Sequence, residues 1–377
     1  MEPFEDFAHT GPDTLAGQFI RRFWQPVMVS EDLEPMRPQR IQVLGQYLTA
    51  YRGEDGRPHL VQDACPHRQT QLYLGWVEDD CIRCFYHGWK FDGEGTCVEQ
   101  PAENESFKDK VRIEGYPVRD YLGFVFAFLG EGEAPVFPLF PEVDETTDTV
   151  TYNCHPVPCN YFQRVENDLD EVHLHFVHRV STDEIGLSQL PEIDVAERDY
   201  GILRKGRRAD DGNNVTRTAH IMMPNVLFTV TPASAADPDW NLHIAWRVPI
   251  DDETMASFIL AVRKGGGEGL VRRPPTDPDP NDITEEVLAG RLRVQDLDPG
   301  YRGLFNVQDN VALAGQGRIV DRSLDRLGAS DKGVILLRQL WEREMKAIHE
   351  GHPIKDWRRP KTSFLDIQSR EMELVKS

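Results

Sequence analysis

The chain has 377 residues, of which 40% are hydrophobic and 28% charged, and its formal net charge is −21. These proportions are those of a globular protein, and the negative charge excludes nucleic acid as a partner because phosphates would be repelled. No apolar run approaches the roughly 18 residues that span a bilayer, and the acidic start lacks the features of a signal peptide, so we expect no membrane contact. Six cysteines in so long a chain do not suggest a disulfide framework, which favours the cytoplasm.

The first third of the chain predicts a small β domain, in which short strands are separated by turn signals. Residues 40–61 contain two strand-like runs around a Gly-Glu-Asp-Gly hairpin, and residues 88–103 repeat this pattern. Residues 116–130 add a further β-rich, aromatic segment. The Pro-rich, acidic stretch 131–148 is the predicted boundary of this domain.

The chain is long enough for two domains of ordinary size, each with its own core. We place the first domain at 1–145 and the second at 146–377. The second domain mixes helices and strands, so the fold class expected for the whole chain is α+β.

Four segments of the second domain carry clear predictions. A helix is expected over 160–178, and strands are expected over 214–233 and 240–250. An amphipathic helix near the C-terminus is predicted to end at Gly351. The Gly-, Pro- and Asp-rich segment 262–282 predicts a long mobile loop, either a lid or a plain surface insertion.

A cluster of cysteine and histidine in the first domain has the spacing of a metal site. Cys65-x-His67 and Cys84-x-x-His87 are two mixed pairs on loops that can close around one centre. Zinc sites usually pair Cys with Cys and His with His, so the mixed pairs favour a Rieske [2Fe–2S] cluster, in which two thiolates hold one iron and two imidazoles the other. We expect the remaining cysteines to be structural, and most of them to be small buried residues: Cys81, Cys97, Cys154 and Cys159.

A second cluster lies in the predicted helix 160–178, which holds three histidines and several acids. Non-haem Fe(II) oxygenases bind their metal with two histidines and one carboxylate and leave positions open for O₂ and substrate. Helical spacing alone favours His175 and His178, which lie three residues apart on one face.

Both clusters resemble one family. The stretches CPHR and CFYHGWKFDGEGTCVEQPAE, with FWQPVMVSEDL upstream, are similar to the Rieske domain of the Rieske non-haem iron aromatic oxygenases. The pattern around Asp170 resembles the phthalate dioxygenase and vanillate O-demethylase branch, because Glu166 takes the place of an asparagine found in naphthalene-type enzymes. The resemblance implies an N-terminal all-β Rieske domain followed by a helix-grip (START-like) catalytic domain with an antiparallel sheet.

The resemblance also implies the ligand sets. The [2Fe–2S] cluster is expected on the four residues of the mixed pairs, and a mononuclear Fe(II) on His173, His178 and Asp309, with Asp321 as the reserve carboxylate. His175 then becomes a core residue or a residue behind the ligands. The five-residue spacing of the two ligand histidines predicts a local distortion of the helix, such as a π-bulge.

Electron supply is expected to come from another protein, because no nucleotide-binding motif stands out in the sequence. The resemblance implies that a reductase or ferredoxin passes electrons from NAD(P)H to the cluster, and that electrons cross to the Fe(II) of a neighbouring subunit in a homotrimer. Asp170 is the expected bridge between the two centres, hydrogen-bonded to a cluster histidine of the neighbour and to a ligand histidine of its own chain.

The substrate and reaction are expectations from the same resemblance. We expect an aromatic acid, oriented by Asn225 and His243 in two apolar strands. The favoured reaction is monooxygenation that O-demethylates a methoxylated aromatic and releases formaldehyde. One alternative is ring dioxygenation of an aromatic carboxylate such as a phthalate, and another is a Rieske electron carrier that is not an oxygenase.

Overall fold

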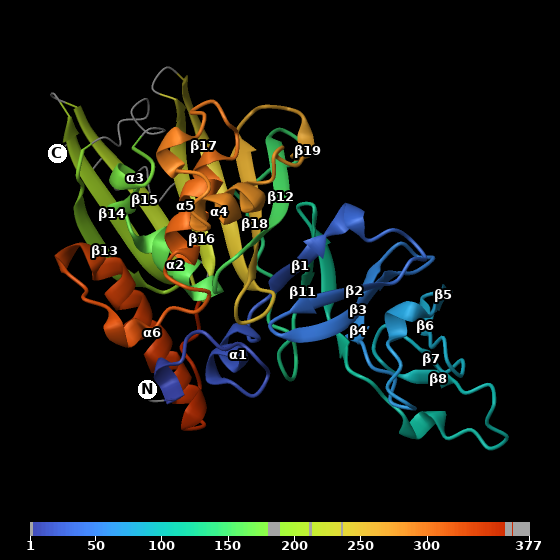
Figure 1. Ribbon diagram of the computed structural model, residues 1–377. Coiled ribbons are helices and arrows are strands. Elements are labelled where there is room, and N and C mark those ends of the chain that lie inside the picture. Colours follow the sequence, from blue (N-terminus) through green and yellow to red (C-terminus); the bar gives the residue numbers. More distant parts are fainter. Residues whose placement is uncertain (1–2, 180–188, 211–212, 235–236, 359–363, 365–377) are drawn as a thin grey trace. The chain divides into compact units, whose positions relative to one another are not determined.

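The fold is described from a computed structural model (Figure 1). It covers all residues except 1–2, 180–188, 211–212, 235–236, 359–363 and 365–377. The chain divides into two compact units, which we call the Rieske unit, Gly11–Phe137, and the catalytic unit, Met1–Thr10 with Pro138–Ser377. Among the described residues, no helix combines the length and apolarity that a membrane span requires.

The Rieske unit is almost entirely β structure. Its strands form three sheets, in the orders β1-β11-β10, β2-β3-β4-β9 and β5-β6-β7-β8. The elements are α1 (Leu15–Ile20), β1 (Gln25–Val29), β2 (Gln39–Val43), β3 (Gln46–Arg52), β4 (Pro58–Gln62), β5 (Trp76–Glu78), β6 (Cys81–Arg83), β7 (Lys90–Phe91), β8 (Cys97–Glu99), β9 (Gly115–Tyr116), β10 (Val118–Tyr121) and β11 (Phe124–Ala127), with short 3₁₀ turns at Ser30–Asp32, Leu72–Leu74 and Lys108–Lys110.

Tight turns set this pattern. Leu44 and Gly45 both have positive φ, 52° and 72°, and turn the chain back between β2 and β3. Residues 40–61 therefore contain parts of three strands, and the prediction of two was wrong because this turn was not recognised. The predicted hairpin in residues 88–103 is confirmed as β7 and β8.

The catalytic unit is built on one eight-stranded sheet, in the order β13-β14-β15-β16-β17-β18-β12-β19. All neighbours are antiparallel except β12 and β19, which run parallel, so the sheet is mixed at one edge. Its elements are β12 (Thr149–Val157), α2 (Tyr161–Leu169), α3 (His173–Phe176), β13 (Glu192–Arg198), β14 (Gly201–Asp210), β15 (Asn213–Met222), β16 (Val226–Ser234), β17 (Asp237–Pro249), β18 (Met255–Arg263), β19 (Gly269–Arg272), α4 (Pro280–Leu288), α5 (Leu304–Ala314) and α6 (Lys332–His349), with 3₁₀ turns at Pro3–Glu5, Val294–Asp296, Arg322–Leu324 and Ala329–Asp331.

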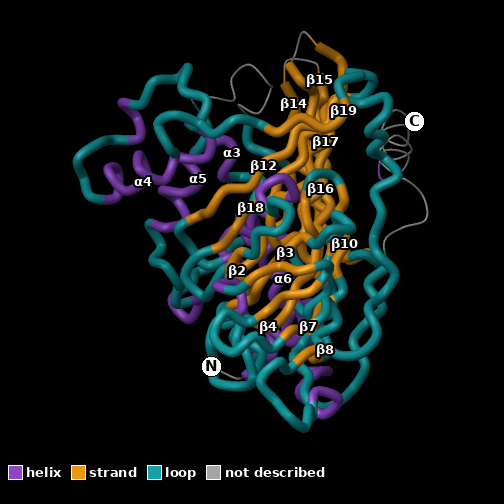
Figure 2. The backbone as a smooth tube through the Cα atoms, turned by 90° about the vertical axis from the view of Figure 1, so that its right-hand side faces the viewer, coloured by secondary structure: helices purple, strands orange, loops and turns teal. Residues whose placement is uncertain are grey.

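Helices cover one face of this sheet. α2 packs against β15, β16 and β17, and α6 packs against β13, β14 and α2. Both views show α3, α4 and α5 on one face of the strands (Figures 1 and 2). On the opposite face Phe364 packs against Tyr200 and Phe228, and Phe140 packs against Trp246. The expected helix-grip arrangement is present. The sheet was expected to be antiparallel, and the parallel pair β12 and β19 at its edge differs from that expectation.

Three local predictions needed correction and one was confirmed. Segment 262–282 is not one long loop, because its glycines reverse the chain and place β19 beside β12. The predicted helix 160–178 is two helices, α2 and α3, separated at Asp170, whose ψ of 112° is not helical. The strand predicted over 214–233 turns at residues 223–225. The amphipathic C-terminal helix is confirmed as α6, followed by Gly351 at a φ of 71°.

Candidate metal centres

Two loops of the Rieske unit carry the mixed cysteine–histidine pairs, and both have the same backbone geometry. The N–H of Gln69 donates to the carbonyl of Cys65, and the N–H of Gly88 donates to the carbonyl of Cys84. In both loops the residue four positions after the cysteine has a positive φ, 64° for Gln69 and 74° for Gly88. Each loop thus closes tightly behind its cysteine and presents the following backbone N–H groups.

The four side chains of these loops converge. Cys65 and Cys84 are buried in the core of the unit, while His67 and His87 are only half-buried. The two imidazole centroids lie 4.5 Å apart, and the ring of His67 stacks on Trp89 at 4.5 Å. Two inner sulfurs and two outer imidazoles are the donor set of a Rieske cluster.

The two sulfurs interact directly. A hydrogen bond from Cys65, opposed by burial and helped by the N–H groups of Tyr86 and His87, lowers the pKa of Cys84 to about 6. The same hydrogen bond and burial raise the pKa of Cys65. Backbone N–H groups aimed at sulfur stabilise thiolates, which are the ligating form. The loops therefore fit an iron–sulfur cluster.

The other cysteines agree only in part with expectation. All six cysteines are free thiols. Cys97 and Cys159 are buried, as predicted, and Cys81 and Cys154 are half-buried. The prediction for Cys154 was wrong because β19 pairs with β12 only as far as Tyr152, so that Cys154 lies where β12 forms the edge of the sheet.

The second candidate centre begins where α2 ends. The Oδ1 atom of Asp170 accepts the N–H groups of Val172, at 2.8 Å, and His173, at 3.3 Å, and so caps the short helix α3. α3 presents His173, and His178 follows just after its end. Because α3 ends at Phe176, between the two histidines, side chains five residues apart can face one centre.

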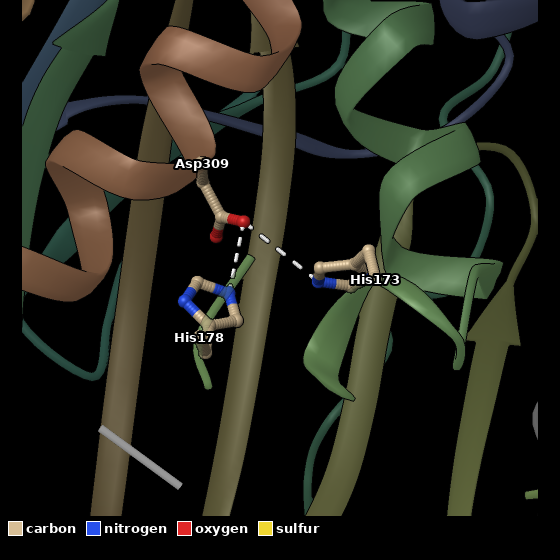
Figure 3. Close-up of side chains that lie close together, drawn as sticks. All are labelled: His173, His178 and Asp309. Atoms are coloured by element: carbon tan, nitrogen blue, oxygen red, sulfur yellow. Dashed lines mark hydrogen bonds and ion pairs between the residues drawn. The ribbon is translucent and has the colours of Figure 1, made fainter. Parts of the chain in front are cut away.

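Three side chains meet at this centre (Figure 3). The Nε2 atom of His178 lies 3.1 Å from Oδ1 of Asp309 on α5, and Nε2 of His173 lies 3.7 Å from the same oxygen. One ligand atom from each residue lies within 4.8 Å of the others, and two of the three side chains are buried. Two imidazoles and one carboxylate oxygen form the donor set of a non-haem iron site.

Both imidazoles are oriented by hydrogen bonds on their far nitrogens. Nδ1 of His173 lies 2.6 Å from the backbone carbonyl of Asp170, and Nδ1 of His178 lies 2.8 Å from Oε1 of Gln308. Acceptors at Nδ1 place the proton there and leave Nε2 free to bind a metal. Burial also lowers the pKa of His173, which favours the neutral, ligating imidazole.

The carboxylate of Asp309 is kept ionised. Burial would raise its pKa, but the charge of the adjacent Arg164 outweighs this and holds the pKa far below the ordinary value. Nη1 of Arg164 lies 2.7 Å from Oδ2 of Asp309. The carboxylate is therefore available as a ligand.

A larger charged group lies beside the centre. Glu171, which is fully buried, binds Arg204 at 2.6 Å, Arg208 at 2.7 Å and Arg217 at 2.8 Å. Three cations around one anion leave an excess of two positive charges. Among the described residues, Nε and Nη2 of Arg204 and Nε of Arg217 have no hydrogen-bond partner although they are buried. Gly206 lies against this group, since a Cβ there would be 2.6 Å from Cγ of Glu171.

The other predicted site residues have different surroundings. Asn225 lies in a turn rather than a strand, and its amide donates to the carbonyl of Arg247 at 2.8 Å. His243 is half-buried on β17, and burial together with Arg247 lowers its pKa to about 3. Asp321 is exposed, caps a 3₁₀ turn and is not part of the centre. His175 is half-buried beside Phe176 and also lies outside the three-residue group.

Several residues around the centre were not predicted. Glu166 on α2 forms ion pairs with Arg322, at 2.9 Å, and with Arg338 on α6, at 2.7 Å. These ion pairs, which were not predicted, connect α2 to the C-terminal part of the chain. Phe305 stacks on His178 with ring centroids 3.4 Å apart. Gln308 directly precedes Asp309 in the sequence, and a polar, buried neighbour of the expected ligand is a signal that could have identified it.

Comparison with known proteins identifies the Rieske domain and the family of the whole chain. Residues 23–120 match the family of the Rieske [2Fe-2S] domain. The chain is 33% identical over 371 residues to the oxygenase subunit of 5,5'-dehydrodivanillate O-demethylase from Sphingobium sp., a match that covers 94% of this chain and 82% of that protein. It is 30% identical over 359 residues to the alpha subunit of phenoxybenzoate dioxygenase from Ectopseudomonas oleovorans, covering 90% of this chain and 83% of that one.

Solved structures of Rieske-type dioxygenases resemble the fold of this chain. In the solved oxygenase–ferredoxin complex of carbazole 1,9a-dioxygenase, the similar chain has a TM-score of 0.64 at 21% identity, and the match covers 93% of this chain and 95% of that chain. This similarity supports the fold, and the sequence matches over nearly the whole length identify the family. The chain belongs to the oxygenase subunits of the Rieske non-haem iron aromatic oxygenases, which are oxidoreductases.

Proposed function

We propose that this chain is the terminal oxygenase of a system that O-demethylates a methoxylated aromatic acid, a monooxygenation that releases formaldehyde. The observation that carries the reaction type is the match to a demethylase oxygenase subunit over 94% of the chain. The convergence of His173, His178 and Asp309 supports an iron centre where such a reaction would occur. The [2Fe–2S] cluster would be held by Cys65, His67, Cys84 and His87.

The two iron groups, when bound, would supply single electrons and activate O₂. The residues of the chain prepare their sites. Asp170 and Gln308 fix the protons of the ligand imidazoles on Nδ1. The Asp170 side chain is itself 34% exposed, so its carboxylate can reach a group outside this chain. This exposure supports a bridging role to a cluster histidine of a neighbouring subunit in a homotrimer. The hydrogen bond to the imidazole of His173 goes to the backbone carbonyl of Asp170, at 2.6 Å, whereas its carboxylate lies 3.9 Å from the same nitrogen.

The sheet face that carries the charged group also supports an acidic substrate. Residues paired directly across antiparallel strands share a face, so one row runs from Arg204 through Ala219, Thr229 and His243 to Ala261. Arg204 belongs to the cluster with two excess positive charges. An anionic carboxylate near this row would offset that charge and offer acceptors to the unpartnered N–H groups.

His243 in this row suits the aromatic part of such a substrate. Its depressed pKa, about 3, keeps the imidazole neutral near pH 7, so it can donate or accept a hydrogen bond without adding charge. Asn225 has less support as a substrate contact, because its amide already binds the backbone of Arg247.

Partners follow from the same sites. Trp76, Phe85 and Tyr86 are exposed aromatic side chains beside His87. Exposed aromatic groups at a redox centre support docking of a protein, either a reductase or ferredoxin that draws on NAD(P)H, or a neighbouring subunit. The ferredoxin complex of carbazole 1,9a-dioxygenase shows such a partner for a chain of this fold. Six free thiols support a reducing compartment, the cytoplasm.

A coupled assay tests the reaction. The purified chain, a generic reductase and NADH are given a panel of methoxylated and plain aromatic acids, and formaldehyde and O₂ are measured. Formaldehyde near one per O₂ on a methoxylated acid is the expected result. No formaldehyde from any methoxylated acid, with a cis-diol from a plain acid, would contradict O-demethylation.

Ring dioxygenation of an aromatic carboxylate is the second candidate, favoured by the match to phenoxybenzoate dioxygenase. The excess positive charge near Glu171 suits both candidates, because both substrates carry a carboxylate. The third reading of the sequence, an electron carrier without oxygenase activity, was wrong, since the chain matches oxygenase subunits over nearly its whole length.

A further inference from the structure

The two carboxylate oxygens of Asp309 have different surroundings. Oδ1 lies 3.1 Å from Nε2 of His178 and 3.7 Å from Nε2 of His173. Oδ2 lies 2.7 Å from Nη1 of Arg164. In Figure 3 both dashed lines to the imidazoles leave the same oxygen of Asp309. One oxygen therefore faces the metal ligands and the other faces a cation.

Arg164 is itself held in place by the helix that carries it. Its guanidinium also binds the side-chain oxygen of Asn167, and its Nε lies 4.0 Å from Oδ1 of Asp168. Asp168 in turn makes a two-bond pair with Arg247 on β17, at 2.7 and 2.8 Å. The charges of this group balance, because it holds two cations and two anions. All four side chains are largely buried: Arg164, Asp168, Arg247 and Asp309.

We propose that Arg164 is a positioning residue that keeps Asp309 a one-oxygen ligand of the mononuclear iron; this rests on the iron site proposed above. A charge-assisted hydrogen bond engages Oδ2 and draws its electron density away from the metal. Two-oxygen binding would turn Oδ2 from Arg164 and leave a buried cation with one strong partner fewer, which is costly. One-oxygen binding keeps a further metal position open for O₂ or substrate.

A purely structural role is the competing explanation. Arg164 joins α2 to α5, and its loss would weaken that contact whatever the metal does. A structural role predicts a lower melting temperature but unchanged coordination of the iron that remains bound. A positioning role predicts a change in the coordination itself.

Nitric oxide is a suitable probe, because it binds an open position of Fe(II) and gives an electron paramagnetic resonance signal that depends on the other ligands. The signal is recorded for the full-length, iron-loaded wild type and for R164K, R164Q and R164M. We expect R164M and R164Q to lose the wild-type signal in favour of a different one, and R164K to retain it, since Lys can donate one bond to Oδ2. The matched control is R338M, which removes a half-buried arginine from a different ion-pair group, that of Glu166 and Asp325.

The outcomes are distinct. R338M is expected to lower the melting temperature and keep the wild-type signal. A wild-type signal in iron-loaded R164M or R164Q would overturn the proposal and leave the iron site intact. If R164M does not fold, R164Q and R164K still decide the question. Absence of the signal in the wild type would overturn the proposed iron site and, with it, the role of Arg164.

Discussion

The cluster site and the mononuclear site obtain their ligands in different ways. In the Rieske unit all four proposed ligands lie within residues 65–87, on two loops that close with the same pair of backbone hydrogen bonds. In the catalytic unit two of the proposed ligands lie near α3, and the third, Asp309, comes from α5, 131 residues after His178. The first site depends on local backbone geometry, whereas the second depends on the packing of distant helices and on the charges around them.

The largest effect is expected from a substitution in the cluster site. C84A removes a cluster ligand and leaves three donors, so we expect loss of the cluster and of all turnover. Absorbance in the visible range and acid-labile sulfide measure the cluster. C97A is the matched control, because Cys97 is buried in the same core but lies outside the two loops. A coloured, active C84A protein would contradict the assignment.

The mononuclear site is tested by D309A. We expect turnover to fall below detection while the cluster remains, and bound iron to drop from about three to about two per chain. Iron analysis with sulfide analysis separates the two centres. D321A should keep the full iron content, because Asp321 is exposed and away from the centre. Full iron in D309A would transfer the role to another carboxylate.

The connection between the two sites is tested by D170N. We expect both metals to remain and turnover to fall about 10- to 100-fold, as for other groups behind metal ligands. The amide can still accept the N–H groups of Val172 and His173, so the helix cap is kept. Rapid-mixing measurement of cluster oxidation should show the delay directly. Normal turnover in D170N would remove Asp170 from the path of electrons.

The charged group around Glu171 is tested by E171Q, which leaves three arginines without their anion. Loss of one partner of a buried ion pair costs about 3–5 kcal/mol, so the melting temperature should fall clearly. E286Q is the control, because Glu286 forms an exposed pair with Arg291, and we expect no measurable change.

The difference in melting temperature between wild type and E171Q should also depend on pH, and the direction of that dependence can be predicted. Burial opposes ionisation of Glu171, but the arginines outweigh it and lower its pKa from 4.5 to about 2. A carboxyl with a lowered pKa stabilises the fold above its unfolded value, and that contribution is lost as the pH falls through the folded value. The difference in melting temperature between wild type and E171Q should therefore be largest above pH 4.5 and shrink toward pH 2. A constant difference would show that Glu171 acts through its shape alone.

The smallest effect concerns the surface of the cluster site. F85S removes one exposed aromatic side chain beside the cluster loops, and we expect a few-fold rise in the KM for the electron donor with unchanged cluster content. V136S, at an exposed position away from the loops, is the control. An unchanged KM in F85S would place donor docking elsewhere.

The same contrast explains what could be predicted from the sequence. The Rieske ligands follow from spacing, because both loops are short and hold their own geometry. His173 was chosen through family resemblance, since regular helical spacing favours His175. That spacing rule assumes a continuous helix, whereas α3 ends at Phe176, before His178. Asp309 also required the resemblance, because no spacing rule connects residues so far apart.

Other features depended on tertiary contacts that a sequence does not display. Segment 262–282 has the composition of a loop, and β19 forms there only because the edge of β12 offers unpaired backbone groups. Arg204 and Arg208 lie four residues apart and would share one face of a strand, but no strand was predicted there, so the cation cluster was not recognised. Their common partner, Glu171, comes from a different element.

Gly206 has a consequence for anyone who sets out to alter the substrate range by directed evolution. It lies between Arg204 and Arg208 on the strand that faces the helices, where libraries would normally vary every residue. Any side chain there would collide with Glu171 and so press on the segment that begins at Asp170 and carries His173 and His178, two of the proposed iron ligands. Variation at this one position is expected to yield metal-poor protein rather than new specificity, and useful libraries should leave it as glycine.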